Sequence, residues 1–287
     1  MSSKKKTGKR KKRIHKKRRR ARMLRRRILL LILTLTLAVT GVVLKDKIVF
    51  YYATYLKEKK RHRLTNTERE QRRIDRIIND HSGNVFGIDI SHYQRREDID
   101  WKTLNIANGA IDIRFVVLRA TMGNRAADKH FDEFWEKAAT NDLIRGAYHF
   151  YRPDEDPVMQ ANSYLLRVRL SAGDLRPVLD VEKLPRKKTR KQFIEDLKVW
   201  LRIVEDAYGA KPILYTYYHF YKDFLREDFA DYPLWLANYN DVPAPSPADE
   251  WLMWQFTENG IVDGIGTKVD LNVINGGDRV LNRLRME

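Results

Sequence analysis

A series of eight short apolar runs between Val85 and Ile274, each rich in β-branched or aromatic residues, restricts the fold more than any other feature. Helix-like segments separate the early runs, notably Asp132–Leu143, Pro157–Leu170 and Thr189–Tyr208, and strands that alternate with helices indicate a parallel sheet. The later gaps are shorter, and the last two are too short for full crossover helices. The runs cover residues 85–91, 115–121, 145–151, 176–182, 212–217, 233–239, 252–257 and 269–274.

Eight strands of this kind favour closure of the sheet into a β/α barrel with reduced helices in its last third. An open doubly wound sheet is the structural alternative, but no Gly-x-Gly-x-x-Gly turn follows the first run. Barrels of about 200 to 250 residues often form one domain. We therefore expect a single barrel domain over residues 83–287.

Acidic residues recur where these runs end. In the stretch RPVLDVEKL, Asp180 and Glu182 are two residues apart, so in a strand both side chains project from one face. Asp89 lies near the end of the first run and Asp270 nearer the start of the eighth. One isolated acid is more often a helix cap or an arginine partner. A same-face pair with two further acids indicates a site, because barrel sites form at the C-terminal ends of the strands.

A cluster of carboxylates without cysteine suits glycosidic cleavage. That reaction needs a proton for the leaving oxygen and negative charge near an oxocarbenium-like centre. Two close carboxylates in unlike environments supply both, because each raises the pKa of the other. Aromatic residues, which can stack on sugar rings or simply fill a core, also crowd the strand ends. They are Tyr93, Tyr148, Tyr151, Tyr215, Trp235, Tyr239 and Trp254.

Metal-dependent hydrolysis is the enzymatic alternative. Asp89 with His92, and His149 or His219, could act as ligands. No His-x-x-x-His or Glu-x-x-His spacing supports this reading. The chain has no cysteine, which excludes disulfides, thiolate metal sites and a cysteine nucleophile.

The motifs resemble those of the family 25 glycoside hydrolases, lysozymes of the bacterial and phage muramidase type. The resemblance covers roughly residues 84–277 and lies in six motifs in the family's order. It implies a modified TIM-type β/α barrel, no metal or organic cofactor, and cleavage of the β-1,4 bond between N-acetylmuramic acid and N-acetylglucosamine in peptidoglycan. The motifs are FGIDISHYQ (86–94), GAYHFYRP (146–153), PVLDVE (177–182), LWLANY (234–239), WQFTENGIVDGI (254–265) and VDLN (269–272).

The resemblance also implies roles for single residues. Glu182 matches the general acid/base, and Asp180 matches the carboxylate that assists the substrate's own N-acetyl group, with net retention. Asp89 and Asp270 match the flanking acids that orient the sugar. Met122 departs from the family pattern, since many relatives have a polar or acidic residue there. Further groove-lining candidates are Tyr148, Tyr215, Trp235, Asn238 and Gln255.

The N-terminal part has a different composition. Residues 1–27 contain 17 of the 56 Lys and Arg residues and no acid, which leaves 39 basic against 38 acidic residues in the rest of the chain. Residues 28–44 are 17 uncharged, mostly apolar residues, which residues 48–56 could extend. At about 1.5 Å per residue, such a helix reaches the short end of bilayer thickness. Residues 45–82 are highly charged and read as a helical stalk with little to bury.

We expect a single-pass protein of the cytoplasmic membrane. The basic head would stay in the cytoplasm and contact anionic lipid, and the barrel would lie outside the membrane. A cleaved signal peptide is one alternative, although its basic region is normally short. A nucleic-acid-binding tail is another, which the adjoining apolar segment disfavours. The rival to an enzyme is a barrel that binds or scaffolds peptidoglycan without cutting it.

Overall fold

The computed structural model describes residues 23, 25–27, 30, 31, 34 and 67–287. The expected membrane helix over residues 28–44 falls almost entirely outside these residues, as do most of the basic head and the stalk up to residue 66. Within the described residues, no helix combines the length and apolar character needed to cross a bilayer.

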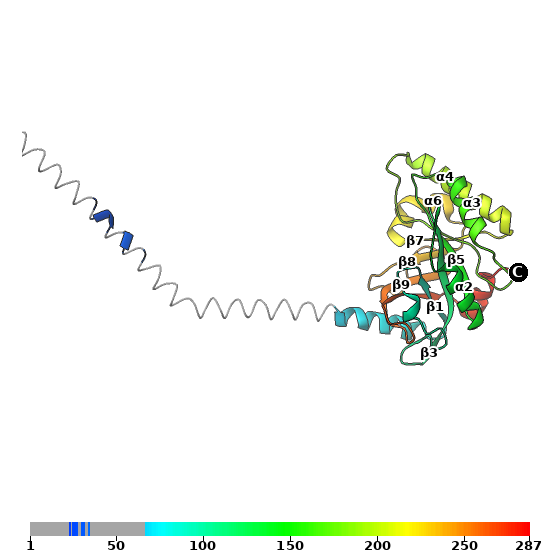
Figure 1. The fold of residues 1–287 in the computed structure, drawn as a ribbon, viewed down its shortest axis with the longest axis horizontal. Helices are drawn as coiled ribbons and strands as arrows, with labels where there is room; N and C mark the ends of the chain where they lie inside the picture. Colours follow the sequence, from blue (N-terminus) through cyan, green and yellow to red (C-terminus); the bar gives the residue numbers. More distant parts are fainter. Residues whose placement is uncertain (1–22, 24, 28–29, 32–33, 35–66) are drawn as a thin grey trace, which may run out of the picture. The chain divides into compact units, whose positions relative to one another are not determined.

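Eight main strands form the barrel of Figure 1, and each coincides with one of the eight predicted runs. Their inward side chains alternate with outward ones, as the strand period of two requires. Two further strands are short additions at the edges, β2 (Asn105–Ile106) and β4 (Ala126–Ala127). The main strands are β1 (Val85–Ile90), β3 (Ile111–Met122), β5 (Ile144–Phe150), β6 (Val178–Asp180), β7 (Ile213–Tyr217), β8 (Leu234–Ala237), β9 (Met253–Gly260) and β10 (Val269–Ile274).

The strands follow one another around the barrel in chain order, and β10 closes it by pairing with β1. From β1 to β9 all neighbouring main strands are parallel. The last strand, β10, is antiparallel to both β9 and β1. The direction of β10 is the one part of the barrel that the run pattern did not predict. It brings the start of β10, not its end, to the rim where the other strands end.

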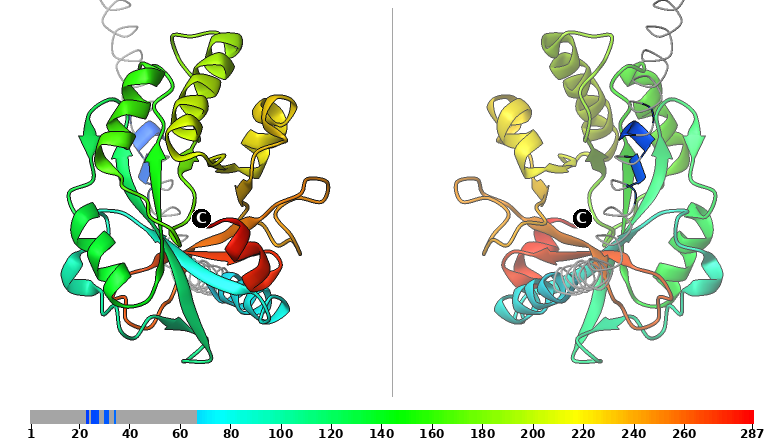
Figure 2. Two further views of the ribbon diagram at one scale, coloured as in Figure 1. Left: turned by 90° about the vertical axis from the view of Figure 1, so that its right-hand side faces the viewer. Right: turned by 90° about the vertical axis from the view of Figure 1, so that its left-hand side faces the viewer.

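Helices cover the outside of the barrel mainly along its first two thirds (Figure 2). The expected helices are present as α2, α3 and α4, and two of them begin with side-chain caps from Asp156 and Thr189. Later connections are reduced: η2 is a π-helical turn, and no helix joins β8 to β9 or β9 to β10. The helical elements are η1 (Arg96–Asp98), α2 (Phe131–Thr140), α3 (Pro157–Arg167), α4 (Arg190–Tyr208), α5 (Tyr218–Phe220), η2 (Tyr221–Leu225), α6 (Arg226–Phe229) and α7 (Gly277–Arg283).

Apolar side chains fill the barrel beneath its C-terminal rim. Phe115 and Val117 of β3 project inward and are fully buried, together with Val178 of β6. Gly87 of β1 leaves room for the Phe115 ring, because a Cβ atom at position 87 would overlap that ring. The acids occupy the next inward positions toward the C-terminal rim. Their side chains therefore lie directly above this packed apolar layer.

A helix over residues 67–80 precedes β1, and most of it belongs to the same compact unit as the barrel, which begins at Glu70. Ile74, Ile77 and Ile78 are 2–6% exposed. They belong to the hydrophobic cluster formed by the helices and the outward-facing strand residues, here called the outer core. Arg73 is also buried, and its guanidinium donates a 2.7 Å hydrogen bond to the carbonyl of Phe256 on β9. The expectation that this segment has little to bury is therefore wrong for residues 70–80. Its few isoleucines share one helix face, and that face meets the barrel wall.

Candidate active site

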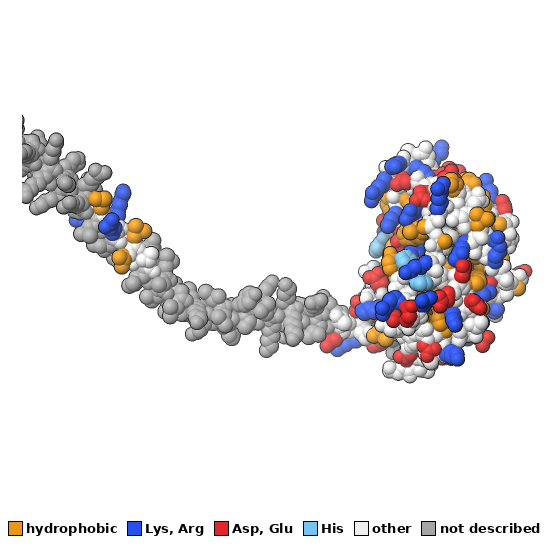
Figure 3. Space-filling view, in the orientation of Figure 1, with side chains coloured by type: hydrophobic (Ala, Val, Ile, Leu, Met, Phe, Trp, Pro, Cys, Tyr) orange, Lys and Arg blue, Asp and Glu red, His pale blue; other side chains and the backbone are white. Residues whose placement is uncertain are grey.

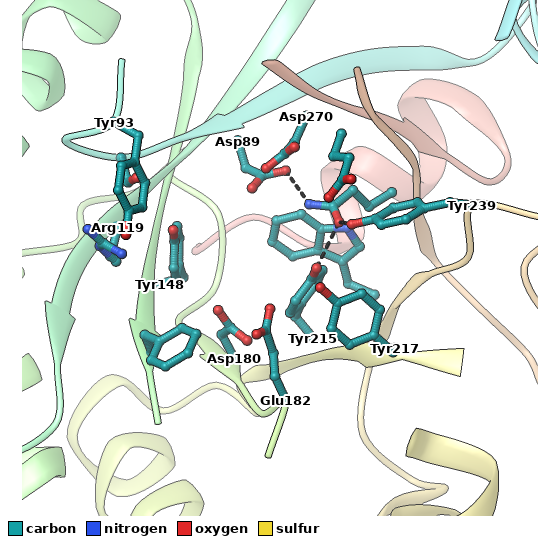
Figure 4. Close-up of a pocket in the computed structure, with 15 residues that line it drawn as sticks. Asp89, Tyr93, Arg119, Tyr148, Asp180, Glu182, Tyr215, Tyr217, Tyr239 and Asp270 are labelled. Atoms are coloured by element: carbon teal, nitrogen blue, oxygen red, sulfur yellow. Dashed lines mark hydrogen bonds between the residues drawn. The ribbon is translucent and has the colours of Figure 1, made fainter. Parts of the chain in front are cut away.

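A pocket with a cavity volume of about 200 Å³ opens at the C-terminal rim of the barrel (Figure 4). Strand ends from all around the ring contribute to it, so residues far apart in the chain meet there. Its lining combines carboxylates with aromatic rings. The lining residues are Asp89, Ser91, Tyr93, Arg119, Tyr148, Phe150, Asp180, Glu182, Tyr215, Tyr217, Trp235, Tyr239, Gln255, Glu258 and Asp270.

All four predicted acids lie in this pocket. Asp89 on β1 and Asp270 on β10 are register partners across the antiparallel pair, and they face Asp180 and Glu182 across the cavity in Figure 4. The position of Asp270 near the start of its run, which seemed to set it apart, is explained by the antiparallel direction of β10.

Asp89 is 7% exposed and is held by two amide side chains. Its Oδ2 accepts hydrogen bonds from Gln255 Nε2 at 2.8 Å and from Asn272 Nδ2 at 2.7 Å. Burial raises the pKa of Asp89 to about 6, and both hydrogen bonds oppose that rise because they stabilise the anion. The environment therefore favours ionised Asp89 at neutral pH.

Asp270 has the opposite protonation preference. Burial, the charge of Asp89 and a side-chain hydrogen bond with Asp89 raise the pKa of Asp270 to about 9. Two register partners with close carboxyl groups cannot both ionise without cost, so the proton stays on one of them. Asp270 is thus a neutral hydrogen-bond donor to the Asp89 carboxylate at neutral pH.

The Asp180–Glu182 segment is held extended at the end of β6. Val181 N donates to Tyr215 O at 3.0 Å, and Thr216 Oγ1 donates to Val181 O at 2.6 Å. These bonds fix Val181 toward the outer core, so both acids on either side of it project inward. The same-face arrangement predicted for the pair is confirmed.

The environments of the two acids differ. Asp180 is 5% exposed, and its Oδ1 has no hydrogen-bond partner within the described part of the chain. Burial, then the charges of Glu182 and Asp89, raise the pKa of Asp180 well above its usual value. Glu182 is only partly buried. Burial and Asp89 raise its pKa too, while the neighbouring Lys183 lowers it. The pair therefore retains a proton to a higher pH than an isolated carboxyl group would.

Gln255 connects the acids to the aromatic wall of the pocket. Its Oε1 accepts hydrogen bonds from Tyr215 Oη at 2.7 Å and from Tyr239 Oη, while its amide nitrogen binds Asp89. The Trp235 ring packs edge-on against Tyr215, with 4.7 Å between the ring centroids. One amide side chain thus orients both a carboxylate and two phenol groups.

Four of the five predicted groove residues line the pocket, namely Tyr148, Tyr215, Trp235 and Gln255. Asn238 does not. It follows the last residue of β8, and its amide group donates to Pro245 O and accepts from the Asn240 backbone N–H, so it holds the β8–β9 loop. Among the other strand-end aromatics, Tyr93 and Tyr239 line the pocket, whereas Tyr151 and Trp254 are buried in the outer core.

Sequence reasoning missed several lining residues, among them Glu258 and Arg119. Arg119 projects from β3 into the pocket wall and makes an ion pair with Asp128 at 3.2 Å, and Asp128 is almost completely buried. The guanidinium also lies 5.4 Å from the centroid of the Tyr93 ring. Arg119 is two residues from Val117 and four from Phe115, so the strand period of two places all three side chains on the inward face of β3. This periodicity could have identified Arg119 from the sequence.

The three histidines considered as metal ligands do not line the pocket. His92 Nδ1 lies 3.0 Å from Asp128 Oδ2, and His149 is buried on the outer side of β5 between Thr121 and Gln160. Burial lowers the pKa of His149 to about 4. His219 lies on α5 and does not line the pocket. Within the described residues, no group of three or more His, Cys, Asp or Glu side chains has a metal-binding arrangement.

Comparisons with known proteins point to one family. The model for "Glycosyl hydrolases family 25" matches residues 88–265. An Escherichia coli K12 protein named YegX is 38% identical over 196 residues, which cover 67% of this chain and 70% of YegX. The autolytic lysozyme of Clostridium acetobutylicum is 28% identical over 67% of this chain and 56% of its own length. The solved family 25 glycosyl hydrolase from Bacillus anthracis superposes with a TM-score of 0.63 at 27% identity, over 71% of this chain and 95% of that chain.

Proposed function

The chain belongs to family 25 of the glycosyl hydrolases, and we propose that it cleaves the β-1,4 bond between N-acetylmuramic acid and N-acetylglucosamine in peptidoglycan. Its membership makes it a hydrolase of the lysozyme and muramidase class. The observation that carries the proposal is the pairing of Asp180 with Glu182 on one face of a strand end, opposite the Asp89–Asp270 pair in the same pocket.

Glu182 is the general acid/base of the proposed reaction. It is less buried than Asp180, its pKa is raised, and it lines the open pocket, so it can hold a proton and reach a glycosidic oxygen. The proton passes to the leaving oxygen as the bond to the anomeric carbon breaks. Glu182 then takes a proton from the water that completes hydrolysis.

Asp180 assists the substrate's own N-acetyl group. With the proton of the pair on Glu182, Asp180 is the carboxylate beside the acetamido N–H. The acetamido oxygen forms a bond to the anomeric carbon as the leaving group departs, and this carboxylate stabilises the positive charge that develops there. Attack of water on this intermediate gives net retention. Asp89 and Asp270 orient the sugar through their remaining acceptor oxygens, because the proton of Asp270 is donated to Asp89.

The direct test measures reducing ends released from peptidoglycan by the full-length chain and by Glu182→Gln. We expect kcat to fall about 10²- to 10⁴-fold with little change in KM, because the substitution removes proton transfer but keeps the side-chain shape. Equal release by both proteins would refute the role of Glu182.

A non-catalytic barrel that binds peptidoglycan is the alternative reading. Clearing of a suspension of isolated walls separates the two, measured for the natural chain and for Asp180→Asn. Clearing by the natural chain alone supports catalysis. Binding to the walls by both proteins without clearing would favour the binding module.

We also propose that the chain is anchored in the cytoplasmic membrane through residues 28–44, with the basic head inside and the barrel outside. The support is the run of 17 uncharged residues after a head with 17 basic residues. A tether would keep cleavage close to the membrane. Protease added to spheroplasts should remove the barrel, and protection of the barrel would refute this topology.

A further inference from the structure

A strongly basic loop borders the pocket. Residues 183–191, here called the basic loop, contain six Lys and Arg residues and no acid. The rest of the domain is not basic, since residues 81–287 together hold 28 basic and 32 acidic side chains. Figure 3 shows Lys and Arg side chains around α4, whose first two residues are Arg190 and Lys191 of this segment, and on other parts of the same face. The positive charge is therefore local and adjoins the pocket.

The backbone of the basic loop is fixed to the rim. The carboxylate of Asp154, which follows β5, accepts hydrogen bonds from Arg186 N at 3.0 Å and Lys187 N at 2.9 Å. Lys188 Nζ donates to Glu155 O at 2.7 Å and pairs with Asp196 at 2.6 Å. Because these bonds use main-chain amides and Lys188, the side chains of Arg186 and Lys187 remain available.

The basic loop begins at the catalytic strand end. Lys183 directly follows Glu182, and its Nζ lies 5.5 Å from the centroid of the Phe150 ring, which lines the pocket. Its charge lowers the pKa values of both Asp180 and Glu182, against the effect of burial. The basic loop therefore continues directly from the strand end that carries both acids.

Four of these cations are exposed and make no ion pair within residues 67–287, namely Lys183, Arg186, Lys187 and Lys191. Lys188 and Arg190, in contrast, pair with Asp196 and Glu227. Unpaired cations at the edge of a site raise the local concentration of anionic ligands and their rate of binding.

We infer that the basic loop binds the free carboxylates of the peptide substituents on a glycan strand held in the pocket, through Arg186 and Lys187. The inference rests on the proposed function, because a glycan backbone of N-acetylated sugars is uncharged and its negative charge lies on the lactyl-linked peptides. The backbone of the basic loop is held in place by Asp154. Cations at fixed positions can bind peptides that project at regular intervals from a glycan strand. The loop would thus favour peptide-bearing glycan over bare glycan.

The test compares two substrates with the full-length chain and the double variant Arg186→Gln/Lys187→Gln at low ionic strength. The substrates are glycan strands with their peptides and the same strands freed of peptide by an amidase, with the lactyl carboxylates that the amidase exposes blocked as amides. On peptide-bearing strands we expect KM to rise about three- to tenfold with kcat unchanged, the size typical of two exposed ion pairs. On bare strands both parameters should stay at the level of the natural chain, and added salt should remove the difference.

The matched control is Arg279→Gln/Arg283→Gln, which removes the same charge from two exposed residues of α7 at the other end of the barrel. It should leave KM for both substrates unchanged. Arg186→Lys/Lys187→Arg should behave like the natural chain. Thermal melting of each variant separates loss of binding from loss of folding.

Each other outcome is decisive. An equal rise in KM on both substrates, or no rise on either, would overturn the inference. So would an unchanged KM together with weaker sedimentation on phosphatidylglycerol-containing vesicles, which would assign the loop to lipid. If the natural chain cleaved neither substrate, the proposed function itself would fail.

Discussion

Asp89 and Asp270 occupy register positions directly opposite each other on β1 and β10, the antiparallel pair that closes the barrel. Their carboxyl groups share a hydrogen bond, and the pKa of Asp270 rises to about 9 while that of Asp89 rises to about 6. The single proton of Asp270 is therefore engaged by Asp89, and the pair presents its remaining acceptor oxygens to the pocket. Because burial raises both pKa values, the contribution of the pair to folding stability depends on pH.

The first prediction concerns stability against pH. Asp270 binds its proton up to about pH 9 in the folded chain but only to about pH 4 when unfolded, from its ordinary value of 3.8. The folded state holds more protons between these values, so stability falls as pH rises through this window. Melting temperatures measured from pH 5 to 9 should fall less steeply in Asp270→Asn than in the natural chain. Parallel profiles would contradict the assignment.

The second prediction concerns Lys183. Because its charge lowers the pKa of Glu182, Lys183→Gln should raise that pKa and keep the general acid protonated to higher pH. The alkaline limb of kcat/KM against pH should therefore move upward. Lys191→Gln, an exposed residue of the same basic loop, is the control and should leave the limb in place. A downward shift in Lys183→Gln would refute the electrostatic role.

The third prediction concerns Gln255. Gln255→Leu removes a hydrogen bond to Asp89 and leaves two phenol groups, the buried Tyr215 and the half-buried Tyr239, without their acceptor. We expect a loss of about 2–4 kcal/mol in unfolding free energy, at about 1–3 kcal/mol for each unsatisfied group. The acid limb of kcat/KM should move to higher pH, since that hydrogen bond lowers the pKa of Asp89. Tyr239→Phe removes one donor only and should cost less; a larger cost than for Gln255→Leu would contradict the network.

The fourth prediction concerns the helix before the barrel. Arg73→Met leaves the Phe256 carbonyl without its donor and should lower unfolding free energy by about 1–3 kcal/mol, measured by urea denaturation. Arg72→Met removes the same charge from the exposed face of that helix and should change stability by less than about 0.5 kcal/mol. Equal effects would mean that the helix does not dock as described.

The strands and the four acids could be predicted because both follow from local pattern. Each apolar run matches a strand, and the i, i+2 spacing of Asp180 and Glu182 sets a common face whatever the fold. Asn238 was wrongly assigned because its motif lies at a strand end. It has the outward phase of Leu234 and Leu236, and its amide bonds to the loop beyond β8 and not to the pocket.

The sequence by itself determined the eight main strands, the helices between the early ones and the residues that provide the acids, because periodicity and capping act within a few neighbours. Only the tertiary structure decided which way β10 runs, that Glu258 joins the pocket, and that three isoleucines of the preceding helix are buried. Those features depend on contacts between segments far apart in the chain. A side chain's burial and its pKa are set by neighbours that closure of the barrel supplies, and local sequence does not specify them.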